Sequence, residues 1–368
     1  MIREMRTVGL LRRAFRYSLE TCLVLLLGCA GSLDTVLAQR TNGRGSKSVS
    51  RATSSGPNTL SPAARESLDA AVAALQANSL GEAERQARAA VTAAPHSAVT
   101  YNILGVVLDR GGRKEQALTA FNAAIRIDPG FVSARNNLGR MLAENGKTAQ
   151  AIAEFERVLK TDPSHVQAHY NLGSLYADAG NFAKSAEHFA LARKTDPNDS
   201  QLALAFLNVA YRASRTQEAD EVADLVERIA GSDTKPLFTL ATVLAENKQY
   251  QRAARLFGRV NELTPHTFEV LYNLGVSLFN LDRNEEAATY LAEAADLNPG
   301  PAETHFRLAL VASARNDHPN AVEEFRHAIE REPKNAKFHF LLGREYSRAG
   351  YWDGAIAENT RAIELNGK

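Results

Sequence analysis

Helix-breaking residues recur along this chain at a fixed interval, and that regularity limits what the chain can fold into. Prolines are 34 residues apart through most of the sequence, with one interval of 68 whose midpoint is Gly231; they are Pro95, Pro129, Pro163, Pro197, Pro265, Pro299 and Pro333. One more step from Pro333 reaches Gly367. Because proline cannot continue a helix and glycine is common just past a helix end, these residues mark one joint in nine successive units.

Each unit contains two helical patterns separated by a turn. In the second unit the first helix carries Leu104, Gly105 and Leu108 on one face, and the second carries Ala117 and Phe121. The small residues let the two helices of a unit approach closely. The large residues are expected to fill the space toward the next unit, and they are Phe121, Phe155, Phe189, Phe257 and Phe325. A single unit cannot bury this face, so stability must come from stacking of neighbours.

The spacing L-G-x2-Y…A-x3-F…P resembles the tetratricopeptide repeat, and it extends over residues 61–368. The resemblance implies an all-α fold, a right-handed α-solenoid (superhelix) of about nine tandem helix-turn-helix repeats. Two features depart from the family pattern. The fifth unit has Leu207 and Ala223 in place of Gly and Phe, which predicts less regular packing. The position of the family's early Trp holds other residues, among them His169, His305 and His339, which we interpret as substitutes for an aromatic packing residue.

The first 38 residues have the pattern of an export signal. Five arginines precede an apolar stretch from Thr21 to Leu33, which is shorter than the roughly twenty residues that a membrane-spanning helix needs. A small-residue cleavage site follows, ending at Ala38. This pattern predicts a signal peptide over residues 1–38 and an exported protein, periplasmic or secreted.

A second interpretation of the N-terminus stays open. Leu26-Leu27-Gly28-Cys29 resembles a bacterial lipobox, in which Cys29 would be lipidated and would anchor the protein to a membrane. Contact with a membrane is expected only in that case. Residues 39–60 are rich in Ser, Gly, Thr and Arg and poor in apolar residues, so they predict a disordered linker.

Composition argues against several other functions. Lys plus Arg number 43 and Asp plus Glu number 42, so the chain lacks the basic excess typical of nucleic-acid binding. The only cysteines are Cys22 and Cys29, and the histidines form no HExxH pair, so no metal site is expected. No strand alternation, phosphate-binding loop or Ser-His-Asp set is evident. We therefore expect neither an enzyme nor a bound cofactor.

The resemblance also implies where partners bind. In the family the first helices of the repeats line a concave groove, and positions 2, 5, 6, 9, 12 and 13 point into it, counted here so that Ser133 is position 2. The candidate partner-binding residues on this basis are Asn137, Arg140, Asn171, Ser174, Asn208, Arg212, Asn273, Tyr170, Tyr272 and Phe306. An Asn side chain can both donate to and accept from a peptide bond of an extended ligand. For any one of these residues, a solvent-facing or packing role is the simpler interpretation, and only the set indicates a groove.

The sequence therefore predicts a scaffold that binds a protein or peptide partner outside the cytoplasm. The family's paired cations that grip a C-terminal carboxylate are not evident, so this ligand is not expected. Two alternatives remain: a lipid-anchored envelope assembly factor, or an accessory subunit of an enzyme complex such as a glycosyltransferase.

Overall fold

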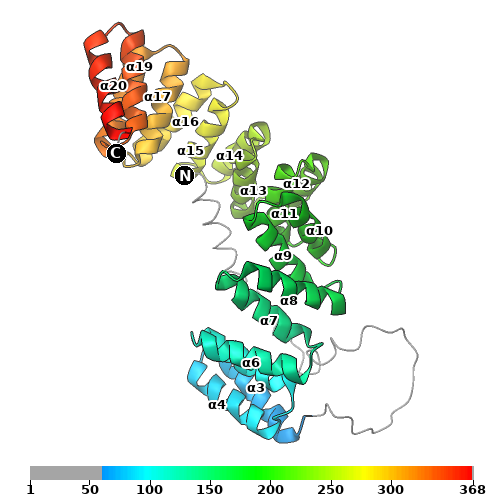
Figure 1. Ribbon diagram of the computed structural model, residues 1–368. Coiled ribbons are helices and arrows are strands. Elements are labelled where there is room, and N and C mark those ends of the chain that lie inside the picture. Colours follow the sequence, from blue (N-terminus) through cyan, green and yellow to red (C-terminus); the bar gives the residue numbers. More distant parts are fainter. Residues whose placement is uncertain (1–59, 367–368) are drawn as a thin grey trace. The chain divides into compact units, whose positions relative to one another are not determined.

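The computed structural model describes residues 60–366, which form helices connected by short turns and contain no strand (Figure 1). The signal peptide and almost all of the linker predicted from the sequence lie outside the described residues. The chain divides into two compact units, residues 1–195 and residues 196–368, which we call unit 1 and unit 2. The all-α repeat fold predicted from the sequence is confirmed within each unit. Among the described helices, none is long and apolar enough to cross a membrane.

Unit 1 contains four helix pairs, and each pair packs against the next along the chain. We call the first helix of a pair helix A and the second helix B. The helices are α3 (Pro62–Gln76), α4 (Leu80–Ala93), α5 (Ala98–Arg110), α6 (Lys114–Ile127), α7 (Val132–Glu144), α8 (Thr148–Thr161), α9 (Val166–Asp178) and α10 (Phe182–Arg193).

Unit 2 continues the same pattern with five pairs. Its helices are α11 (Ser200–Arg212), α12 (Thr216–Ala230), α13 (Thr234–Glu246), α14 (Tyr250–Leu263), α15 (Phe268–Phe279), α16 (Asn284–Leu297), α17 (Ala302–Ala314), α18 (His318–Arg331), α19 (Ala336–Arg348) and α20 (Trp352–Asn366). In the fifth repeat, Leu207 and Ala223 are both buried, so this repeat has its large residue on helix A and its small one on helix B.

The turn between helix A and helix B repeats one backbone conformation. A residue with positive φ occurs there at every step of 34: Asn78, Gly112, Gly146, Gly180, Ser214, Lys248, Asp282, Asn316 and Gly350. At Gly112 the amide of the following residue, Arg113, donates to the carbonyl of Leu108, which closes the helix end. The left-handed residue thus fixes the angle at which helix B folds back on helix A.

The phenylalanines of the B helices pack inside their own repeats. A Cβ added to Gly105 would lie 2.6 Å from the ring of Phe121, and one added to Gly139 would lie 2.8 Å from the ring of Phe155. That the same rings also fill the space toward the next repeat stays a prediction. The glycine on helix A provides the room that the ring on helix B occupies.

The three histidines at the early Trp position connect two parts of the chain. His339 Nε2 lies 3.0 Å from the carbonyl oxygen of Pro333, and its Nδ1 lies 2.6 Å from the carboxylate of Glu358 on helix B. His169 and His305 make the same contact with Pro163 and Pro299. We call this arrangement the proline-carbonyl lock. These residues therefore provide polar contacts as well as the packing inferred from the sequence.

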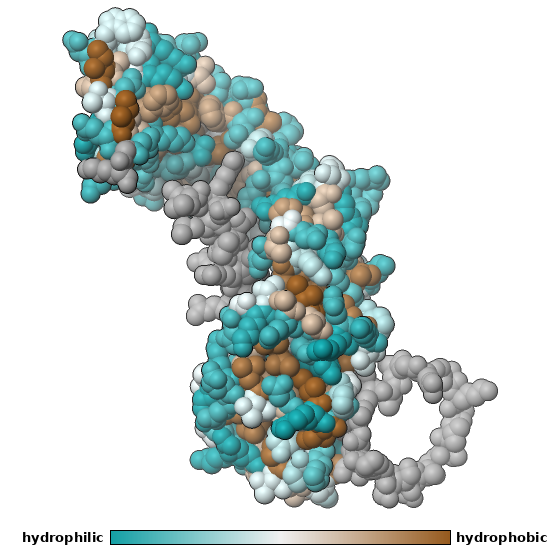
Figure 2. All heavy atoms as spheres, viewed as in Figure 1, coloured by the Kyte–Doolittle hydropathy of each residue, from teal (hydrophilic) through white to brown (hydrophobic). Residues whose placement is uncertain are grey.

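Helix α20 leaves apolar side chains exposed at its end of unit 2, where hydrophobic patches interrupt the hydrophilic surface (Figure 2). Ile363 is 73% exposed, whereas the equivalent residues of the second and third repeats, Ile125 and Leu159, are partly buried against the core. In unit 1 the next repeat along the chain covers the equivalent face of helix B, whereas on α20 this face is exposed.

Candidate functional site

Two of the predicted groove asparagines form hydrogen bonds with other asparagines of unit 1. Asn137 on α7 donates from Nδ2 to Oδ1 of Asn102 on α5 at 3.0 Å, and both side chains are buried. One repeat further on, Asn171 on α9 donates to Oδ1 of Asn136 at 3.4 Å. These pairs join the A helices of successive repeats. Because buried polar groups need partners, they stabilise the stacking of unit 1.

The neighbouring polar residues of unit 1 are also occupied. Arg140 is buried and forms ion pairs with Asp109 of the preceding repeat and with Glu144 on its own helix. Ser174 is buried and donates to the carbonyl of Tyr170 at 3.0 Å. The half-buried ring of Tyr170 packs edge-on against Phe189, at 5.5 Å between centroids. The role of these residues in partner binding stays a prediction.

The predicted residues of unit 2 are more accessible, with one exception. Arg212 is exposed, and Asn208, Asn273 and Tyr272 are half-buried. Phe306 is 2% exposed, and its ring stacks on Phe338 at 5.0 Å, so it is a core residue. Within unit 2 the candidates lie on three different A helices, α11, α15 and α17.

Unit 2 also contains a surface hollow of about 600 Å³ on the face predicted to bind partners. Six of its lining residues come from positions 9, 12 or 13 of three successive A helices, and two come from the turn and helix B that follow α17. These residues are Phe279, Leu310, Ser313, Ala314, Arg344 and Arg348, followed by Asn316 and His318. The hollow therefore lies on the stripe that the family resemblance assigns to the groove.

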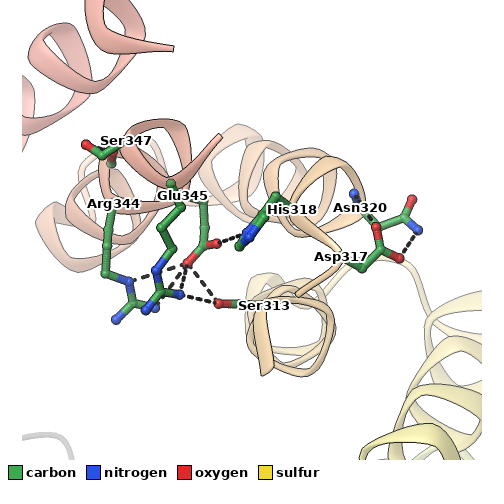
Figure 3. A network of polar contacts seen from close by, with 9 residues as sticks. Ser313, Asp317, His318, Asn320, Arg344, Glu345 and Ser347 are labelled. Atoms are coloured by element: carbon green, nitrogen blue, oxygen red, sulfur yellow. Dashed lines mark hydrogen bonds and ion pairs between the residues drawn. The ribbon is translucent and has the colours of Figure 1, made fainter. Parts of the chain in front are cut away.

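A buried carboxylate, that of Glu345, contacts four of the residues that line this hollow (Figure 3). Glu345 accepts from the hydroxyl of Ser313 at 2.8 Å, lies 3.1 Å from Nδ1 of His318, and forms ion pairs with Arg344 and Arg348 at 3.3 and 3.1 Å. Burial alone would raise the pKa of Glu345. The hydrogen bonds from Ser313 and His318, together with the two guanidinium groups, outweigh burial and lower this pKa below its ordinary value.

None of the residues that line this hollow was predicted from the sequence as a binding residue. A signal is present at positions 9 and 13, where Arg140 is followed by Glu144 in the third repeat but Arg344 is followed by Arg348 in the last. Like charges four residues apart on a helix repel each other, so this pair calls for an anion nearby. Glu345 is this anion, because it forms ion pairs with both Arg344 and Arg348.

Metal binding has no support in the part of the chain that the structure describes. Among residues 60–366, no group of three or more His, Cys, Asp or Glu side chains is arranged to hold a metal ion. His169 and His188 lie close, with 3.0 Å between their Nδ1 atoms, but they form a pair only.

Stacked helix hairpins with one period and one turn geometry define a class of helical-repeat proteins. The chain belongs to the tetratricopeptide repeat family, because the model described as "Tetratricopeptide repeat" matches residues 68–130, 136–200, 238–301 and 306–367. Proteins of this class are generally non-catalytic scaffolds for protein interactions.

Solved structures with the same repeat include PilF of Pseudomonas aeruginosa, with 20% identity over 56% of this chain and 95% of that one, and a TM-score of 0.47. YrrB, described as a TPR protein with an unusual peptide-binding site, shares 22% identity over 50% of this chain and 94% of its own, with a TM-score of 0.42. A tetratricopeptide repeat protein from Parabacteroides merdae covers 77% of this chain and 99% of its own, at 16% identity and a TM-score of 0.40. No curated protein matches the chain.

Proposed function

We propose that this protein is an exported scaffold that binds an extended segment of another protein along the A helices of unit 2. The observation that carries the proposal is the hollow formed by α15, α17 and α19. It combines apolar side chains, Phe279 and Leu310, with the guanidinium groups of Arg344 and Arg348. The hollow thus offers apolar contacts beside hydrogen-bond donors, and a peptide, with its side chains and backbone carbonyls, can use both.

The position of the hollow supports a peptide rather than a small molecule as the ligand. It is shared by three successive repeats, so a bound segment would run across them and contact equivalent positions in turn. Phe340 at position 5 of α19 is 55% exposed on the same stripe, and an exposed aromatic side chain is a suitable anchor for a partner's apolar residue.

Capture of partners from an envelope extract of the host tests this proposal. Leu310→Asp places an unpaired charge in the hollow, and it should abolish capture of any partner that wild type retains. Leu297→Asp is the matched control, because Leu297 is exposed on helix B of the repeat before that of Leu310, outside the hollow. Equal capture by both variants would count against the proposed face.

Export is the second part of the proposal, and it rests on the sequence of residues 1–38. The intact mass of the protein purified from its host tests it. A mass that begins at Gln39 is expected. A diacylated Cys29 as the first residue would replace the signal-peptide interpretation by the lipid-anchored one, and an uncleaved Met1 would contradict both.

A further inference from the structure

Helix α20 exposes three large apolar side chains on one face, at its end of unit 2 (Figure 1). Trp352 is 67% exposed, Ile356 is 66% exposed and Ile363 is 73% exposed. They are separated by four and seven residues, which is close to one and two turns of helix, so the three side chains share a face. We call these three residues the α20 stripe.

In earlier repeats the equivalent positions are covered. Val322 and Ile329 on α18 lie 34 residues before Ile356 and Ile363, and both pack, partly buried, against the core that α17, α18 and α19 share. Aromatic residues at the position of Trp352 in the fourth and sixth repeats are half-buried, and they are Phe182 and Tyr250. The α20 stripe is therefore a repeat-to-repeat contact surface that is uncovered among residues 60–366.

Helix α3, in the first repeat, does not present a surface that matches this stripe. In the second repeat, the hydroxyl of Thr100 donates to the carbonyl of Ala94 in the preceding repeat, and Val107 lies two turns later on the same side of α5; both residues are buried. The equivalent residues of α3 are Glu66 and Ala73, which are exposed. If α3 of another copy stacked on the α20 stripe, the Glu66 carboxylate would lose water against apolar side chains, which is costly.

The α20 stripe can instead pack against its own copy. The polar residues on the same face are Asn359 and Thr360, and neither carries a charge. Two stripes can therefore pack face to face without like charges inside the contact. Around a two-fold axis every apolar residue contributes twice, once from each copy.

We propose that a second copy of this chain covers the α20 stripe, so that the protein forms a two-fold dimer through α20. None of the three stripe residues lines the hollow formed by α15, α17 and α19. Dimer formation therefore does not depend on partner binding, and each dimer carries two hollows. Two binding sites in one assembly raise the affinity for a partner that offers its segment twice.

The dimer contact is small. Helix α20 has 15 residues, so it is about 22 Å long. One pair of such helices buries less than the roughly 800 Å² per partner of a standard interface, so the association is weak, with a Kd on the order of 10 μM.

Sedimentation velocity and tryptophan fluorescence of the protein purified from its host test the dimer, across concentrations from well below to well above this Kd. The sedimenting mass should rise from one chain to two chains and no further. Trp352 is the only tryptophan of the chain, so its emission reports on the stripe alone. Its emission maximum should move to shorter wavelength in step with the mass, because the ring leaves water in the dimer.

Ile356→Asp should raise the Kd of the dimer at least about tenfold, because it places an unpaired charge in the apolar contact. Ile229→Asp is the matched control, because Ile229 is an exposed isoleucine on α12, away from the stripe, and it should leave the Kd unchanged. Leu310→Asp should also leave the Kd unchanged, since Leu310 lines the hollow. Equal effects of Ile356→Asp and Ile229→Asp would overturn the proposal.

Three results with wild type would also overturn the proposal, and none of them depends on whether a variant folds. A single chain at every concentration, with the emission of a water-exposed tryptophan, would show that no copy binds. A single chain whose emission is shifted at every concentration would show that another segment of the same chain covers the stripe. Assemblies that keep growing with concentration would show head-to-tail contacts in place of a two-fold pair.

Discussion

Gly275 lies where an added Cβ would come within 2.6 Å of Cγ of Leu291 on the neighbouring helix of its repeat. Gly275→Ala should therefore lower the free energy of unfolding by about 1–3 kcal/mol, the usual cost of overpacking a filled core. Gly258, on α14, has nothing within 4 Å of such a Cβ. Gly258→Ala should raise stability by up to about 1 kcal/mol, because alanine has the higher helix propensity. Urea unfolding of both variants measures their free energies of unfolding. Equal effects of the two substitutions would contradict the close packing of Gly275 against Leu291.

The buried carboxylate of Glu345 gives the stability of unit 2 a dependence on pH. Its pKa is lower in the folded protein than the unfolded value of about 4.3, so its contribution is present above that pH and is lost as the pH falls through the folded pKa. Glu345→Gln should lower the free energy of unfolding by about 1–3 kcal/mol near neutral pH.

The difference in the free energy of unfolding between wild type and Glu345→Gln should be smaller in acid than near neutral pH. Urea unfolding under both conditions measures it. Glu364→Gln changes an exposed acid on α20 and is the control, with little expected effect at either pH. A difference that stays constant from neutral to acidic pH would show that the network does not hold Glu345 ionised.

The packing roles of individual apolar and small residues were the part of the structure most readily predicted from the sequence. The glycine and phenylalanine positions follow from the repeat, and the structure confirms that these phenylalanines are buried. The exposure of polar residues could not be predicted from the sequence of a single repeat. Asn137 is buried because Asn102 of the preceding repeat lies next to it, and this neighbour is 35 residues away in the sequence.

At the scale of the helix, the proline-carbonyl lock fixes how helix A begins. His339→Phe keeps an aromatic ring but removes the contacts with the carbonyl of Pro333 and with Glu358. We expect it to lower the free energy of unfolding by about 1–2 kcal/mol, since two part-buried hydrogen bonds are lost. His266→Phe is the control, because His266 is exposed. No loss of stability in His339→Phe would support the simple packing role inferred from the sequence.

Helix order and turn positions follow directly from the period of 34. The turn residues between helix A and helix B include Ser214 and Lys248, which have positive φ although neither is glycine. Their local sequence does not favour this conformation. The stacking of the repeat imposes it, so the period identified these turns where residue preferences alone would not.

At the scale of the whole molecule, each repeat within a unit contacts mainly its neighbours along the chain. The family and the all-α architecture could therefore be predicted from spacing alone, because the same local rule applies nine times. The ligand face could be predicted only as a stripe. One part of the stripe is distinguished by Arg344 and Arg348, which form ion pairs with Glu345. This feature departs from the repeat pattern, so the repeat could not predict it.

The central claim is that partners bind on the A helices of unit 2, and site-specific photo-cross-linking tests it most directly. A photoreactive amino acid replaces Ala314, which is exposed in the hollow, or Leu297, which is exposed on α16 outside it. After irradiation in the host envelope, the account predicts a discrete cross-linked partner from position 314 and none from position 297. Cross-links from position 297 alone would contradict it.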